Sequence, residues 1–201
     1  MPLIQDTFPA PSLDPTRWSD IQDGSVSLTI GVPMDGVYPE TVDDVGDAVT
    51  ITSQSKLIVP GVLDFDTSIF YEDFPTDPDQ ALVAFLGWRS MQLDGSLQPS
   101  YGADILLCRK PDAQFFFQRH TISTGVENRS TIIADPASGA DGGFRVVRSG
   151  FSYRLYRYDA IGMTWDLLST EVVPHVGPGF IVFGLFAEDP MAPGFPWVFQ
   201  T

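Results

Sequence analysis

The chain has 201 residues, of which 43% are apolar and 18% are charged, and 26 acidic residues against 11 basic ones give a net charge of −15. This length suits one domain with a sizeable core, and the apolar content excludes a long disordered tail. The negative charge argues against a nucleic-acid partner, because an acidic surface repels phosphates. The 18 glycines, 17 prolines and 12% aromatic residues are typical of a β protein with frequent turns.

Short strand-like segments separated by turn signals follow one another along the chain. Apolar residues alternate with serine and threonine over 25–32, which predicts a half-buried strand. The nearly continuous apolar segment 81–91 predicts a central strand, and 103–109 with 114–122 predict a hairpin across residues 110–112. Further strands are expected at 3–8, 48–53, 56–59, 62–71, 130–134, 144–148, 151–158, 165–168, 179–187 and 197–200. No helical period persists over ten residues without a glycine or proline, so no helix is predicted.

About a dozen short strands in a chain of this size predict an all-β fold, an antiparallel two-sheet jelly-roll sandwich. No linker-like segment interrupts the series, so residues 1–201 are expected to form a single β-sandwich domain. The start of the sequence has no signal-peptide pattern, and no run approaches the ~20 apolar residues of a membrane span. We therefore expect synthesis in the cytoplasm, no export signal and no membrane segment.

Several phrases of the sequence occur in a recognisable order. Asp6-Thr7-Phe8 is followed by Leu13-Asp14 and Trp18, and later Phe144–Tyr156 leads into Gly162–Trp165 and then Phe183–Ala187. This order resembles the concanavalin A-like lectin/glucanase superfamily, which includes laminin G-like domains. The resemblance implies a concanavalin A-like jelly roll in which Trp165 caps the core at the end of a hairpin. These phrases specify a scaffold and say little about a site.

Catalytic signals are weak. Glycosidases that this chain resembles typically carry two glutamates four residues apart on one strand, with an aspartate between them. The glutamates here are Glu40, Glu72, Glu127, Glu171 and Glu188, and no two lie within ten residues of each other. A carboxylate pair from separate strands stays open, with Asp64, Asp66 and Glu72 as examples. We therefore predict that the chain is not an enzyme.

Nucleophile and metal motifs are also missing. The sequence has no serine in a nucleophile-elbow pattern, and one cysteine with two distant histidines cannot make the usual zinc site. Cys108 lies in an apolar run and is expected to be buried, while His120 and His175 are expected at a strand end and in a loop. No cofactor is required, although calcium is possible at Asp43, Asp44 and Asp47 or at Asp77 and Asp79. Plain solvated acidic loops are the alternative.

Binding residues are sought among exposed aromatic side chains beside polar groups. Trp88 lies in an apolar strand and is expected in the core, whereas Tyr101 lies in a loop. Alternation along 153–158 puts Arg154, Tyr156 and Tyr158 on one face, suited to a glycan or a protein partner, with a solvated face as the alternative. The proline-stiffened segment 191–196 suggests an interface, with packing against the edge of its own sandwich as the alternative. The candidate ligand- or partner-binding residues are Tyr101, Arg154, Tyr156, Tyr158, Met191, Phe195 and Trp197.

The missing signal peptide, the single domain and the missing catalytic motif favour, by analogy, a non-enzymatic virion protein of a tailed bacteriophage. It would be made in the host cytoplasm and act in capsid decoration (cement) or in tail-associated receptor binding. Expected partners are capsid or tail proteins, further copies of the chain in a homo-oligomer, and a cell-surface glycan. The alternatives are a stand-alone carbohydrate-binding lectin-like protein and a glycoside hydrolase with a dispersed carboxylate site.

Overall fold

The computed structural model describes residues 12, 15, 18–23, 27–30, 37–40, 48–53, 64–72, 74, 82–90, 103–112, 114–121, 126–134, 139–173, 179–187 and 198–200. Every regular element in these residues is a strand, as predicted. The strands are β1 (Trp18–Asp23), β2 (Ser27–Ile30), β3 (Val37–Glu40), β4 (Ala48–Ser53), β5 (Phe65–Glu72), β6 (Leu82–Ser90), β7 (Ala103–Arg109), β8 (Gln114–Thr121), β9 (Val126–Ala134), β10 (Gly142–Ser149), β11 (Ser152–Asp159), β12 (Thr164–Val172), β13 (Gly179–Ala187) and β14 (Val198–Gln200). None of the described segments is a long apolar helix able to cross a membrane.

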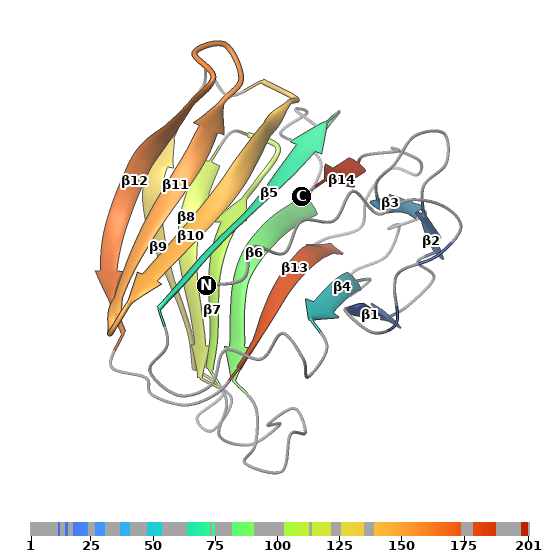
Figure 1. The fold of residues 1–201 in the computed structure, drawn as a ribbon, viewed down its shortest axis with the longest axis horizontal. Helices are drawn as coiled ribbons and strands as arrows, with labels where there is room; N and C mark the ends of the chain where they lie inside the picture. Colours follow the sequence, from blue (N-terminus) through green and yellow to red (C-terminus); the bar gives the residue numbers. More distant parts are fainter. Residues whose placement is uncertain are drawn as a thin grey trace.

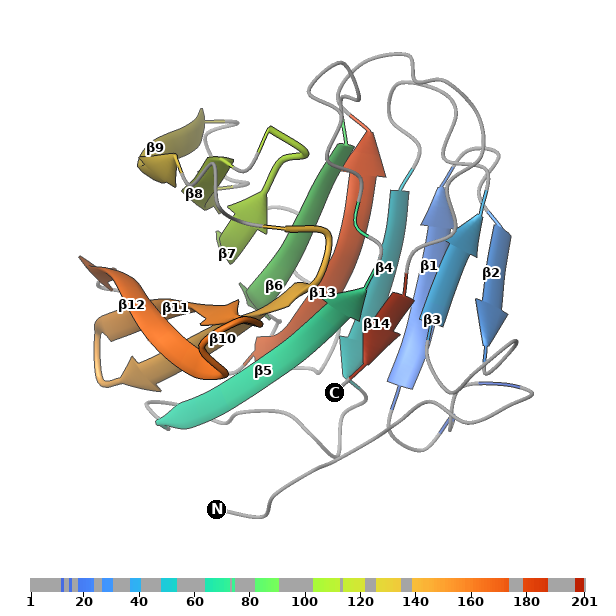
Figure 2. The same cartoon turned by 90° about the horizontal axis from the view of Figure 1, so that it is seen from above.

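The strands form two seven-stranded sheets that face each other (Figure 1). Sheet A has the order β1-β4-β13-β6-β7-β8-β9, and sheet B has the order β12-β11-β10-β5-β14-β3-β2. The view from above shows β12, β11, β10 and β5 as one layer opposite β9, β8, β7 and β6 (Figure 2). Strands distant in sequence are neighbours, such as β13 between β4 and β6, which is how a jelly roll is connected. The predicted antiparallel sandwich is confirmed.

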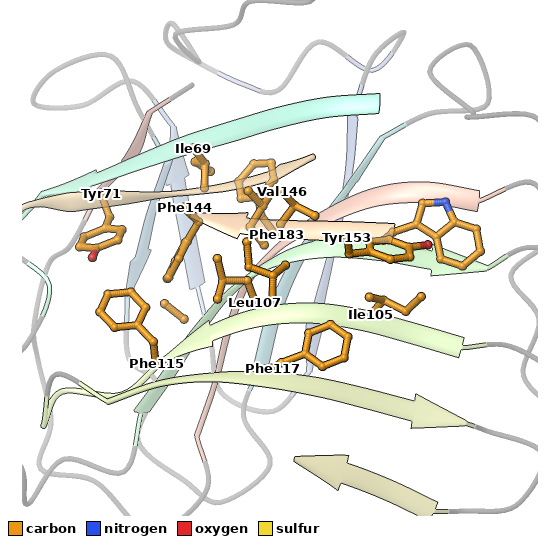
Figure 3. Packing of buried hydrophobic residues seen from close by; sticks show 14 of the residues in the cluster. Ile69, Tyr71, Ile105, Leu107, Phe115, Phe117, Phe144, Val146, Tyr153 and Phe183 are labelled. Atoms are coloured by element: carbon orange, nitrogen blue, oxygen red, sulfur yellow. The ribbon is translucent and has the colours of Figure 1, made fainter. Parts of the chain in front are cut away.

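The core lies between the inner faces of the two sheets, because strand alternation sends every second side chain there. Phe144 of β10 is fully buried, and its ring centroid lies 5.1 Å from that of Tyr71 and 6.2 Å from that of Phe115 across the sandwich. Figure 3 shows Leu107 between these rings and Val146. Burying one such large side chain contributes roughly 1.5–3 kcal/mol. Trp88 is buried in the same cluster, as expected.

Two arginines are also buried in the sandwich. Arg109 stacks 4.9 Å from the ring of Tyr71 and donates a 2.7 Å hydrogen bond from Nη2 to the carbonyl of Gly139. Arg148 lies 5.5 Å from the ring of Tyr153 and donates from Nε to the carbonyl of Gly150 at 3.1 Å. Aromatic faces and carbonyls therefore replace part of the hydration that burial removes from each guanidinium.

Several predicted boundaries are wrong, and two strands were missed. The segment 130–134 is part of β9, which begins at residue 126, and 165–168 is part of β12, which continues to residue 172. Neither β1 nor β3 was predicted, because β1 is largely polar and β3 contains Pro39. Proline is tolerated there because Pro39 is paired on one side only, with Leu28 of β2. The neighbour on the other side, β14, pairs with β3 only at Val37. The predicted strands 3–8 and 56–59 lie outside the described residues.

Candidate functional site

The outer face of sheet A is apolar at its centre. On β7, Leu106 and Cys108 lie on this face, alternating with Ile105 and Leu107, which belong to the inner core. A second buried cluster covers four strands of the sheet and consists of Val83, Phe85, Leu106, Cys108, Phe116 and Val182, all at most 4% exposed. The prediction that Cys108 is buried is confirmed. Sheet A is thus buried on both faces around its centre.

Near the start of β7, residues that pair in register form a row across the same face of sheet A. Its members lie on four neighbouring strands: Arg89, Asp104, His120 and Glu127, hereafter the polar row. Asp104 alternates with Leu106 and Cys108, and directly opposed residues share a face, which assigns the row to the outer face. Asp104 and Glu127 are two strands apart, so a strand spacing of about 4.8 Å separates their Cα atoms by about 9–10 Å.

Gln118 lies in the next row, where Leu106 pairs with Gln118 and Gln118 pairs with Arg129. Its side chain is buried at 7% exposure, and its Oε1 has no hydrogen-bond partner among the described residues. Leaving a buried acceptor unsatisfied costs roughly 1–3 kcal/mol. The face therefore holds, beside the polar row, an acceptor that a hydroxyl could satisfy.

The carboxylates named as examples of a dispersed pair belong to sheet B instead. Asp66 accepts hydrogen bonds from Nε and Nη2 of Arg145 at 2.8 and 2.6 Å. Asp64 accepts from the backbone N–H of Gly150 at 2.8 Å, and only the backbone of Glu72 is described, opposite Val198. Asp64 and Asp66 thus already have partners that hold the ends and the outer face of sheet B.

The structure confirms the predicted shared face on β11. Arg154, Tyr156 and Tyr158 lie on the outer face of sheet B, while Tyr153 and Leu155 are fully buried on the inner face. Whether these outward residues bind a ligand stays a prediction. Residues 101, 191, 195 and 197, the acidic residues 43, 44, 47, 77 and 79, and His175 lie outside the described residues. Within those residues, no group of three His, Cys, Asp or Glu could hold a metal ion.

Trp165 does not cap the core, contrary to the prediction. It pairs with Tyr158, whose position faces outward, and its ring lies 5.2 Å from Tyr158 and 5.5 Å from Phe70. Gly143, between β5 and β11, leaves room for this arrangement: a Cβ there would lie 3.3 Å from Trp165. The hairpin phrase around Trp165 fixes the strand but leaves open which face the ring takes.

The polar row was missed because its residues do not form a short sequence motif. Asp104 and Glu127 are far apart in sequence and come to lie in one row only when three antiparallel strands pair in register. Part of the signal was present in the predicted hairpin, which closes with Lys110 N–H donating to the carbonyl of Gln114 at 2.9 Å. Counting back from that closure would have paired Asp104 with His120.

No protein-family model matches this sequence, and no curated protein matches it. Solved structures do. A glycoside hydrolase family 16 endo-glucanase from Bacteroides ovatus covers 98% of this chain and 97% of its own with a TM-score of 0.64 at 11% identity. A Bacillus licheniformis β-glucanase matches with a TM-score of 0.56 at 13% identity, covering 98% of this chain and 97% of the glucanase. A β-1,3-glucanase from Mycobacterium marinum matches with a TM-score of 0.58 at 12% identity, covering 98% of this chain and 95% of the glucanase. The chain therefore has the concanavalin A-like jelly-roll fold that these proteins have, and the fold implied by the predicted resemblance is confirmed.

These neighbours also correct two predictions. The non-enzymatic virion protein is wrong, and so is the statement that the chain is not an enzyme, because the three solved proteins named above, which share its fold over nearly their whole length, are glucanases. Both predictions rested on missing signals. The motif sought was a set of carboxylates on one strand, whereas a sheet also brings carboxylates together across strands.

Proposed function

We propose that this protein is a glycoside hydrolase that acts on a β-glucan, with its two carboxylates contributed by different strands. The observation that carries the proposal is the polar row, which brings Asp104 and Glu127 onto one face of sheet A. The fold supports the substrate class, because the solved proteins that share it include an endo-glucanase and a β-1,3-glucanase. This role corresponds to a glycoside hydrolase with a dispersed carboxylate site.

A single-strand site is not available on β7. The alternate positions that share the outer face are Asp104, Leu106 and Cys108, so this strand offers one carboxylate. Glycoside hydrolysis requires two, one to protonate the leaving oxygen and one to act as base or nucleophile. The second must therefore come from a neighbouring strand, and Glu127 of β9 occupies the same row.

The spacing of the pair favours inversion at the anomeric carbon. Inverting glycosidases keep their carboxyl groups about 6.5–9.5 Å apart so that water fits between the base and the sugar, whereas retaining enzymes need about 5–5.5 Å. Residues two strands apart have Cα atoms separated by about 9–10 Å, and carboxyl groups held at a similar separation would leave room for that water. We therefore propose direct attack by water, which the anomeric form of the first product tests.

The test is hydrolysis of a mixed-linkage β-glucan and of a β-1,3-glucan, followed by the release of reducing ends. The wild-type protein should release them, and proton NMR of the first product should show the inverted anomer. Asp104→Asn and Glu127→Gln should each lower the rate roughly 10²–10⁴-fold, the usual contribution of a general acid or base.

Glu171→Gln is the matched control, because Glu171 is a carboxylate of β12 in sheet B that accepts a hydrogen bond from Ser169. This variant should retain full activity. Absence of any hydrolysis by the wild-type protein would refute the proposal, and so would activity that survives in both row variants.

A further inference from the structure

The outer face of sheet B carries an aromatic platform on the side of the molecule opposite the polar row. It consists of Phe70 of β5, Tyr158 of β11 and Trp165 of β12, which share one register row with Gly143 of β10. Their ring centroids lie 5.1 to 5.5 Å apart and their planes are inclined to one another by 44° to 89°, so the rings form a compact cluster with both faces and edges toward solvent. These strands are neighbours at the front of the sandwich in Figure 1.

Gly143 allows the rings to meet across the middle of the row. A Cβ at this position would lie 3.2 Å from the ring of Phe70 and 3.3 Å from that of Trp165. The rings thus lean over a strand that has no side chain of its own there. Each ring is half-buried, so its orientation is held by neighbours while part of its surface stays in solvent.

A neutralised guanidinium lies in the next row. Arg145 is 5.9 Å from the ring of Trp165 and 5.5 Å from that of Tyr156, and it forms a bidentate ion pair with Asp66 at 2.6 and 2.8 Å. Both side chains of the pair are accessible, at 33% and 47% exposure. The platform therefore has fixed donors and acceptors beside it and little local net charge.

This combination matches the chemistry of a sugar ring, which has an apolar face of C–H groups and a rim of hydroxyls that donate and accept. Aromatic rings supply rigid apolar contact area, and a few fixed polar groups supply orientation, as in most small-ligand sites. A neutral glycan also escapes repulsion by a chain of net charge −15.

The size of the patch argues against a stable protein partner. The backbone row spans three interstrand spacings, about 14 Å, but its two end rings converge to 5.5 Å over Gly143, so the platform offers on the order of 100 Å² at most. A stable protein interface buries about 800 Å² on each partner. The patch suits a short stretch of polysaccharide instead.

We infer that the aromatic platform is a second carbohydrate-binding site, which holds a neutral β-glucan chain on the face opposite the polar row. The inference rests on the proposed function for its substrate class. Binding at the platform would keep the protein on a polymer while the polar row acts elsewhere on the same polymer, a gain from linked binding rather than from chemistry.

Retention of the protein by mixed-linkage β-glucan in affinity gel electrophoresis tests the site. Trp165→Ala should weaken retention at least tenfold while leaving hydrolysis of short soluble oligosaccharides unchanged. Val172→Ala is the matched control, because Val172 lies on the same strand and the same outer face, seven residues from Trp165, and is 70% exposed. Arg145→Gln removes the ion pair with Asp66 and the guanidinium beside the rings of Trp165 and Tyr156, on an accessible side chain, and should weaken retention several-fold, which keeps the test valid if Trp165→Ala fails to fold.

The outcomes separate this inference from the proposed function. Retention that Trp165→Ala abolishes, in a protein that hydrolyses nothing, supports the platform and refutes only the hydrolase. Hydrolysis with retention unchanged in Trp165→Ala and Arg145→Gln overturns the platform alone. The platform is also overturned if Val172→Ala weakens retention equally, or if Trp165→Ala removes self-association and leaves retention intact.

Discussion

Tyr153 should make the stability of this protein depend on alkaline pH. Its side chain is fully buried between the sheets, its ring lies 6.4 Å from that of Phe65, and its hydroxyl has no hydrogen-bond partner in the described part of the chain. Burial raises the pKa of Tyr153 to about 12 from its ordinary value of 10.0, although nearby Arg148 lowers it. The native fold therefore holds the phenol proton more tightly than the unfolded chain does.

The sign follows from proton counting. Between pH 10 and pH 12 the unfolded chain has released this proton and the native protein has kept it, so the free energy of unfolding falls as pH rises. The contribution is complete below about pH 10 and lost by about pH 12. A shift of about two pKa units corresponds to about 2.7 kcal/mol, at roughly 1.4 kcal/mol per pH unit.

Urea denaturation of the wild-type protein and Tyr153→Phe across pH 8–12 measures this term. Taking the difference between the two proteins cancels the titration of all other groups. Below pH 10 the variant should be as stable as wild type or more stable by about 1 kcal/mol, because it removes a buried hydroxyl without a partner. Above pH 10 its advantage should grow. A difference that stays flat across this range would show that the hydroxyl is solvated and refute the reasoning.

Three further substitutions or reactions test the packing. Gly87→Ala should cost about 3 kcal/mol or more by thermal or urea denaturation, because its Cβ would collide with the backbone of Ile105 on β7, whereas Gly139→Ala, with nothing within 4 Å, should change stability little. Phe144→Ala should cost about 3–5 kcal/mol in the same assay, and a loss below 1 kcal/mol would contradict its place in the core. Cys108 should not react with a thiol reagent in the native protein and should react fully once urea unfolds it.

The fold could be predicted largely because buried strands and tight turns have recognisable local sequences. The apolar run 81–91 gave a central strand, since β6 is paired on both sides and buried on both faces. The hairpin around Lys110 was equally predictable, because Asp112 accepts from the Gln114 N–H at 3.0 Å in a turn that its sequence favours. Strands held mainly by their neighbours have no such sequence pattern, as β3 with Pro39 shows.

The site was less predictable, because it depends on register. Alternation alone placed Arg154, Tyr156 and Tyr158 on one face of β11, and this needed only local periodicity. The polar row needed the relative offsets of β7, β8 and β9, and β8 and β9 change register between Phe115 and Phe116. Such an irregularity cannot be predicted from either strand alone, so the place of Asp104 and Glu127 in one row could be found only from the structure.

Burial determines where function can be placed on this sandwich. Sheet A is apolar and buried on both faces around its centre, so polar groups occur toward the end of its strands, where the polar row lies. Sheet B buries only its inner face in the described residues of β10 and β11, and its outer face is free to carry the aromatic platform. With sheets about 10 Å apart, the two surfaces are separated by the thickness of the sandwich. A short oligosaccharide can therefore occupy only one of them, whereas a polymer can engage both. Loss of the platform should accordingly matter in proportion to substrate length.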